Sequence, residues 1–152
     1  MLSAINKIAI VEQHCSNSGV RLTDKRKQVL SCLIEADSAL SAYDVISLLQ
    51  RKYDIHMQAM SVYRILDFLH GVNLIHKLEL VNKYIVCSHI ACDHEHEKSQ
   101  FLICSKCTSV SEVSFDKTII DNLKKLAERS GYFLSADQLE FSCVCKSCSD
   151  IT

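Results

Sequence analysis

Apolar residues recur at helical spacing through the first half of the chain. The pattern predicts four helices, over 3–16, 24–36, 42–52 and roughly 58–70. Thr23 and Ser41 stand directly before the second and third of these, where a side-chain oxygen caps the first helical turn. The fourth helix carries one apolar stripe at i, i+3, i+4 and i+7, formed by Val62, Ile65, Leu66 and Leu69.

Two short segments after the fourth helix alternate apolar and polar residues. Residues 73–80 and 83–88 read as a hairpin that turns near Val81 and Asn82. Helices followed by a two-stranded hairpin describe a winged helix-turn-helix, whose last helix enters the DNA major groove and whose hairpin is the wing. The alternative is an ordinary small helical domain, because successive amphipathic helices are common.

The second half of the chain has a different pattern of polar and apolar residues. A polar segment over 89–98 precedes expected strands over 101–104 and 109–115, a helix over 117–130 and a final strand over 132–143. The helix is expected to turn its apolar positions inward, namely Ile119, Ile120, Leu123, Leu126 and Ala127. We therefore predict an α+β protein with a winged helix-turn-helix domain over 1–82. A small α/β dimerisation and metal-binding domain is expected over 83–152.

Composition narrows the class of protein. The 152 residues are 48% hydrophobic and 23% charged, which is typical of a folded domain and not of a disordered chain. No apolar run is long enough for a membrane span and no secretory signal is recognisable, so we expect a cytoplasmic protein. Residues 1–77 hold nine Lys/Arg against seven Asp/Glu, a net of +2, and the remainder holds eight against eleven, a net of −3. This mild polarity is compatible with a DNA-reading first half.

Nine cysteines include two C-x-x-C pairs, which are Cys104 with Cys107 and Cys145 with Cys148. Each pair presents two thiolates from one tight turn, and two such turns complete the closed tetrahedral site of structural zinc. A redox disulfide or two unrelated cysteine pairs are the alternatives. Cys143, two residues before the second pair, is a rival ligand.

A second group of potential ligands is less regular. It comprises His76, Cys87, His89, Cys92, His94, His96 and Glu112. Imidazole, thiolate and carboxylate all bind zinc, but composition alone does not select the members. A zinc deaminase would need H-x-E and P-C-x-x-C motifs, and the chain has neither an H-x-E nor a proline. No nucleophile elbow, metalloprotease helix, P-loop or dinucleotide fingerprint occurs, so we do not expect an enzyme or a small-molecule substrate.

Basic and aromatic residues of the first half are candidate DNA contacts. Arg21, Lys25 and Arg26 surround the start of the second helix, where they can meet phosphates. Tyr63 and Arg64 project from the fourth, and an arginine there can read guanine through two hydrogen bonds. An ordinary solvated charged face explains the same residues equally well.

Several motifs occur in an order that resembles the ferric uptake regulator (Fur) family of metal-responsive repressors, and within it the zinc uptake regulators. They are Arg21-Leu-Thr-Asp-Lys-Arg26, Ser41-Ala-Tyr-Asp44, Ser61-Val-Tyr-Arg64-Ile-Leu-Asp-Phe-Leu69, His76-Lys-Leu-Glu79, Tyr84-Ile-Val-Cys87 and the two C-x-x-C pairs. The resemblance covers about residues 15–150. The chain departs from it at Asp24 and at Ala59-Met60, where proline is usual, and at Thr108, where glycine is common.

The resemblance implies a homodimer that binds an AT-rich operator in double-stranded DNA, with two Zn²⁺ ions per chain. It assigns Cys104, Cys107, Cys145 and Cys148 to a structural site. It assigns His76, Cys87, Glu112 and a further histidine to a regulatory site between the domains, for which we choose His96 over His94. It also marks Arg64 as base-reading and Tyr43 and Tyr63 as DNA-facing.

The resemblance thus predicts a zinc-responsive repressor that controls zinc-uptake genes. The thiolate of Cys87 favours zinc over iron at the regulatory site. An iron- or peroxide-sensing repressor of the same family is one alternative. A zinc-dependent enzyme with an open His/Cys/Glu site is another, and a plain zinc-stabilised interaction domain is a third.

Overall fold

The computed structural model describes residues 4–90, 99–135 and 138–150. Its contacts divide the chain into two compact units, Met1–His94 and Glu95–Thr152. The expected boundary at 82/83 would fall in the turn of a hairpin whose two strands pair with each other, and both strands lie in the first unit. No helix in the described part of the chain is long and apolar enough to cross a bilayer.

The first unit begins with four helices. They are α1 (Ala4–Asn17), α2 (Asp24–Ala36), α3 (Ala42–Tyr53) and α4 (Ala59–Gly71). Thr23 caps α2 by accepting a hydrogen bond from the backbone N–H of Arg26. Ser41 and Asp44 form a reciprocal capping box at the start of α3. Both caps stand where the sequence predicted them.

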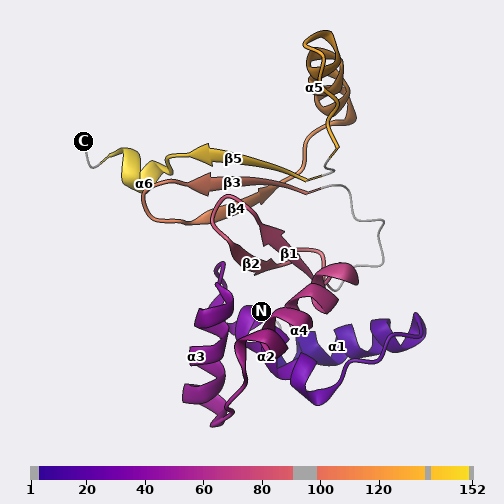
Figure 1. Ribbon diagram of the computed structural model, residues 1–152, viewed down its shortest axis with the longest axis vertical. Helices are drawn as coiled ribbons and strands as arrows, with labels where there is room; N and C mark the ends of the chain where they lie inside the picture. The colour runs from indigo at the N-terminus through magenta and orange to yellow at the C-terminus, as the bar shows by residue number, and fades with distance from the viewer. Residues whose placement is uncertain (1–3, 91–98, 136–137, 151–152) are drawn as a thin grey trace. The chain divides into compact units, whose positions relative to one another are not determined.

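A hairpin follows the helices (Figure 1). Its strands are β1 (Ile75–Leu78) and β2 (Lys83–Val86), which are antiparallel, with Ile75 opposite Val86. Leu40 adds a bridge on the other side of β2, because its backbone exchanges two hydrogen bonds with that of Tyr84, at 2.9 and 2.7 Å. The predicted wing is therefore present and is joined to the helical layer.

One apolar core holds the first unit together. It takes fully buried residues from α1, α2, α3 and α4, and Tyr84 and Cys87 from the hairpin side. The predicted stripe of α4 supplies Val62, Leu66 and Leu69, each with no exposed surface. This arrangement is the winged helix-turn-helix expected from the sequence.

The second unit is a small sheet with two helices. Its elements are β3 (Gln100–Cys104), β4 (Val110–Val113), α5 (Lys117–Arg129), β5 (Leu139–Cys143) and the short α6 (Lys146–Ser149). The strand order is β4-β3-β5, with β4 antiparallel and β5 parallel to β3. The expected strand over 132–143 is shorter than predicted, and α6 was not predicted. The α+β class is confirmed.

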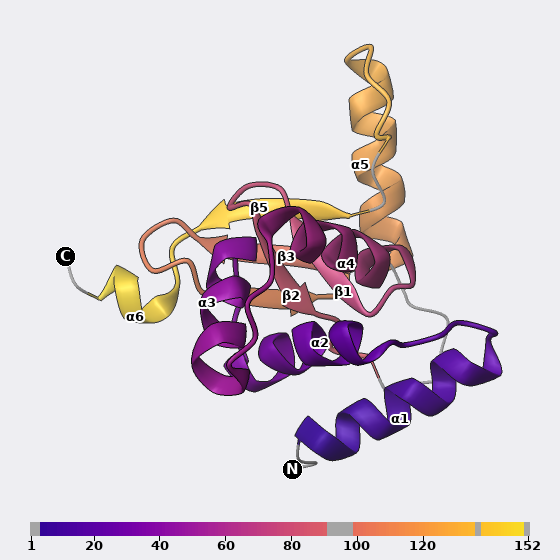
Figure 2. The same ribbon diagram turned by 60° about the horizontal axis from the view of Figure 1, so that its bottom comes forward.

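The amphipathic helix α5 corrects one expectation. We predicted that its apolar stripe turns inward, but no residue of α5 is buried. Ile119 is 45% exposed and Leu126 is 60% exposed. Figures 1 and 2 show the reason, since α5 projects away from the three-stranded sheet instead of lying across it. The stripe is present, but the described part of the chain covers it only in part, since Ile120, Leu123 and Ala127 are half-buried.

Candidate metal centre and nucleic-acid interface

The two C-x-x-C pairs meet at one end of the second unit. Cys104 ends β3, and Cys107 follows in the turn that leads to β4. Cys145 caps α6, and Cys148 lies within it. The four Sγ atoms all lie within 4.8 Å of one another, and those of Cys107 and Cys145 are 3.7 Å apart.

This spacing fits one tetrahedral zinc ion. A Zn–S bond of about 2.3 Å places two ligand sulfurs about 3.8 Å apart across a tetrahedron. The observed separation of 3.7 Å is close to that value. The sulfurs are free thiols in this structure and form no disulfide. Four convergent thiols at this distance fit a structural zinc ion and leave no position for a water ligand.

The surrounding backbone favours the thiolate form of the first ligand. The N–H of Cys145 donates to Sγ of Cys104 over 3.3 Å. Hydrogen bonds from the backbone N–H groups of Cys145 and Cys107 lower the pKa of Cys104 to about 6. A thiolate is the form that binds metal, so Cys104 is prepared for a cation. The neighbouring thiols of Cys145 and Cys107 raise the pKa of Cys148 to about 12, so this ligand would lose its proton as a cation binds.

Cys143, the rival ligand, lies outside the four-sulfur cluster. It faces Cys104 in the β3–β5 register, yet its Sγ donates to the carbonyl of Phe141 at 3.5 Å. The sequence spacing alone did not distinguish it from Cys145.

In the first unit, His76 and Cys87 lie near each other on the wing. His76 is opposite Ile85 in the β1–β2 register, and Cys87 follows two residues later. Residues two apart on a strand share a face, so His76 and Cys87 are diagonal neighbours on one side of the hairpin. Their ligand atoms lie within 4.8 Å of each other. Cys87 is 1% exposed and packs in the core of the first unit.

The other proposed regulatory ligands lie in a different part of the chain. Glu112 is on β4, opposite Phe101 of β3, and its carboxylate accepts a hydrogen bond from the hydroxyl of Ser99. Ser99 was not singled out from the sequence, where nothing marks it as a partner of Glu112. His96, its alternative His94, and Cys92 lie outside the described residues.

The expected base-reading arginine and the two expected DNA-facing tyrosines lie on the helices of the first unit. Arg64 is exposed and Tyr63 half-buried on α4, and Tyr43 is 66% exposed in the first turn of α3. Arg64 points away from the core because the buried stripe of α4 occupies the opposite side of the helix. A helix with a buried stripe and an exposed arginine has the form of a recognition helix.

The basic residues at the start of α2 differ in their exposure and contacts. Arg21 and Lys25 are exposed. Arg26 donates through Nη1 to the carbonyl of Arg21 at 2.7 Å, and its guanidinium lies 3.4 Å above the ring centre of Phe68. Arg26 therefore joins α2 to α4 by a cation–π contact, and this contact occupies the group that we expected to meet phosphate.

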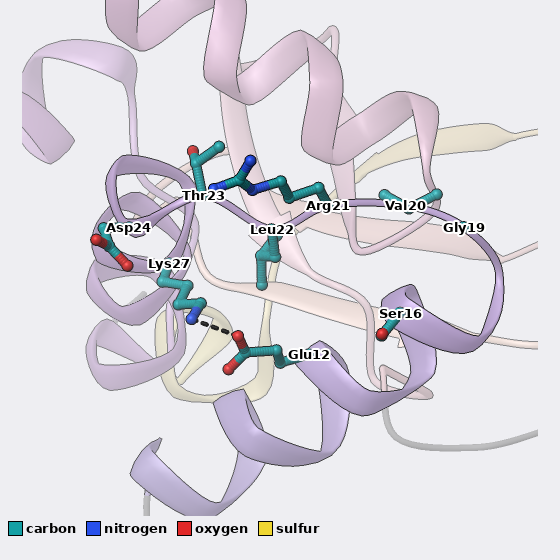
Figure 3. Close-up of a pocket in the computed structure, with 9 residues that line it drawn as sticks. All are labelled: Glu12, Ser16, Gly19, Val20, Arg21, Leu22, Thr23, Asp24 and Lys27. Atoms are coloured by element: carbon teal, nitrogen blue, oxygen red, sulfur yellow. Dashed lines mark ion pairs between the residues drawn. The ribbon is translucent and has the colours of Figure 1, made fainter.

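Figure 3 shows a pocket of about 550 Å³ beside this region. It lies between the second half of α1 and the loop that leads into α2, and Arg21 and Thr23 line one side. Lys27 reaches across it to form an ion pair with Glu12. Because the lining holds two basic residues, Arg21 and Lys27, and two acidic residues, Glu12 and Asp24, the pocket has no excess of formal charge to attract an ion.

Comparisons with known proteins agree with these observations. The chain is 33% identical over 144 residues to the zinc uptake regulation protein of Escherichia coli (strain K12). The matched region covers 95% of this chain and 82% of that protein. It is 26% identical over 149 residues to the ferric uptake regulation protein of Bacillus subtilis (strain 168), with 95% of each covered.

Solved structures give the same result. A zinc uptake regulator complexed with zinc and DNA superposes with a TM-score of 0.82 at 30% identity, over 99% of this chain and 98% of that one. Holo XcZur superposes with a TM-score of 0.75 at 31% identity, over 94% and 96%. Residues 17–142 match the model of the ferric uptake regulator family. Since this match spans most of the chain, the protein belongs to the ferric uptake regulator family.

Proposed function

We propose that this protein is a zinc-responsive transcriptional repressor that binds operator DNA as a homodimer and controls zinc-uptake genes. The observation that carries the proposal is the similarity, at a TM-score of 0.82 over 99% of the chain, to a zinc uptake regulator complexed with zinc and DNA. The winged helix of the first unit supplies a reading helix, α4, with Arg64 exposed upon it.

We assign two zinc ions to each chain. Cys104, Cys107, Cys145 and Cys148 hold the structural ion, and the sulfur spacing within 4.8 Å supports this assignment. His76, Cys87, His96 and Glu112 hold the regulatory ion. The resemblance to zinc uptake regulators supports that set, and so does the His76–Cys87 pair on one face of the wing. A thiolate in the set favours zinc over the harder iron(II) ion of an iron or peroxide sensor.

The two ions serve different purposes. Four thiolates form a closed site without an open position, so the structural ion stabilises the second unit and supports no catalysis. The regulatory ligands respond to zinc because occupancy favours the DNA-binding conformation of the dimer. The difference in zinc affinity between the two conformations appears as tighter DNA binding. We infer a cytoplasmic regulator without an enzymatic reaction.

The test compares DNA binding with and without the regulatory ion. The zinc-loaded wild type selects duplexes from a randomised pool, and the affinity for an enriched duplex is then measured at fixed salt with zinc and with a mild chelator. We expect at least tenfold weaker binding after chelation, within the usual range of allosteric coupling. The double variant Cys87→Ala, His96→Ala is expected to lose this dependence.

The matched control is Cys15→Ala, which removes a buried thiol of α1 that belongs to neither ligand set. It is expected to keep the zinc dependence. Metal analysis should find one tightly held and one exchangeable zinc per wild-type chain. If the double variant and the wild type show equal zinc dependence of DNA binding, Cys87 and His96 do not hold the regulatory ion.

A further inference from the structure

Helix α4 has two clearly different faces. Val62, Leu66 and Leu69 are buried on one of them. On the opposite face stand Met60, Arg64 and Asp67, at i, i+4 and i+7, and all three are exposed. Met60 therefore lies one helical turn before Arg64 on the same exposed face.

Met60 is unusual on this face. Its side chain is 65% exposed, although its neighbours Gln58 and Ser61 are polar. A single exposed apolar side chain needs no explanation by itself. At this position, however, it is the first large side chain of the helix that carries Arg64.

The first turn of α4 has no acidic side chain that would repel the phosphates of DNA. The helices α2 and α3 each have an acidic residue in the first turn and a side-chain cap. In α4 the first turn has no acidic residue, and Gln58 provides no side-chain cap. The partial positive charge of a helix N-terminus attracts phosphate, and the N-terminal residues of a recognition helix contact base edges. Asp67 lies two turns further along, where its negative charge does not oppose this approach.

We propose that Met60 reads the C5-methyl group of a thymine in the major groove, close to the base that Arg64 contacts. The thioether side chain has no hydrogen-bond donor, so it gains most from an apolar contact, and thymine alone among the four bases presents a methyl group there. Four residues span about 6 Å along a helix, so the thymine lies within about two base pairs of that base. This inference rests on the proposed DNA-binding function.

The test removes the methyl group alone. The zinc-loaded full chain first selects duplexes from a randomised pool, and each thymine of an enriched duplex is then replaced in turn by deoxyuridine, which lacks only the C5-methyl. We expect one thymine per half-site whose replacement weakens wild-type binding about fourfold, the effect of about one buried methyl-sized group. Met60→Ala should bind the original duplex about fourfold more weakly and show no sensitivity at that position.

Two further variants make the result specific. Met60→Leu keeps an apolar side chain and should keep the sensitivity to deoxyuridine. Gln58→Ala changes an exposed neighbour and should also keep it. If Met60→Ala and the wild type lose affinity equally at every deoxyuridine position, Met60 does not read the methyl group. If no duplex is enriched by the zinc-loaded wild type, the proposed function itself is wrong.

Discussion

The backbone N–H of Cys145 donates a hydrogen bond to Sγ of Cys104, although the two cysteines lie 41 positions apart in the sequence. The contact exists because β5 runs parallel to β3 and places Cys143 opposite Cys104. The second C-x-x-C pair then begins two residues later, at the end of the sheet. The strand pairing therefore assembles the thiol site, and an ion bound there would in turn hold β3 and α6 together.

Removing one of the four thiols should destabilise the second unit. Cys145→Ser is expected to lose the tightly held zinc, because three thiolates no longer close the site. Structural zinc contributes on the order of 10 kcal/mol to the folding of small zinc domains. The unfolding temperature of the purified protein should therefore fall by more than about 10 °C, as measured by circular dichroism with parallel metal analysis.

Cys143→Ser is the matched control, since Cys143 is also a cysteine of this strand end but lies outside the four-sulfur cluster. It should retain its zinc and most of its stability. If Cys143→Ser loses zinc and Cys145→Ser retains it, the fourth ligand is Cys143 and not Cys145.

The capping box of α3 gives a prediction that depends on pH. The backbone N–H and the hydroxyl of Ser41 both donate to the Asp44 carboxylate, at 2.8 and 2.7 Å, and they lower the pKa of Asp44. The folded state therefore prefers the ionised carboxylate. Its contribution is complete above the unfolded pKa of about 3.9 and is lost as the pH falls through the lower folded value.

Asp44→Ala should consequently cost about 1 kcal/mol near pH 7 and much less near pH 3. The measurement is the difference in unfolding temperature between the variant and the wild type, since zinc loss in acid affects both proteins alike. Ser47→Ala, an exposed change in the same helix, should cost less than about 0.5 kcal/mol at either pH. If Asp44→Ala lowers the unfolding temperature more near pH 3 than near pH 7, the direction given for the pKa shift of Asp44 is wrong.

Local features of this chain were predictable because short-range chemistry determines them. Thr23 and Ser41 cap the helices that follow them, and the first C-x-x-C pair lies at the expected turn after β3. Thr108 was noted as a departure from glycine, and the structure has it at φ 58°, in the left-handed region that glycine favours. The left-handed conformation is therefore present at this position although the residue is not glycine.

Features that depend on distant partners were not predictable. Nothing in the sequence shows that Arg26 stacks on Phe68, because the contact arises only when α2 packs beside α4. The link between Ser99 and Glu112 likewise depends on the pairing of β3 with β4. For α5, periodicity identified an apolar stripe but not what covers it, since a pattern is the same whether its partner is the same chain or a second copy.

The different surroundings of Arg26 and Lys25 predict different consequences of substitution. Arg26→Met removes the contact with Phe68 and should cost about 1 kcal/mol of stability, with little change in the salt dependence of DNA binding. Lys25→Ala removes an exposed charge and should leave the unfolding temperature unchanged. If Lys25 contacts phosphate, its loss should reduce the slope of log affinity against log salt by about 1. Thermal unfolding and DNA titrations at several salt concentrations measure both effects.

The exposed stripe of α5 predicts the surface on which two chains associate. Leu126 is 60% exposed, and the loop after the helix exposes Tyr132 at 72% and Phe133 at 82%. Several large apolar side chains exposed within one short stretch of chain are costly in water and are typical of a protein–protein interface. Leu126→Asp should place a charge in that interface and yield a chain with the mass of a monomer by light scattering, whereas the wild type should have the mass of a dimer. Lys125→Asp changes the adjacent exposed position and should remain dimeric. A dimeric Leu126→Asp protein at micromolar concentration would place the interface elsewhere in the chain.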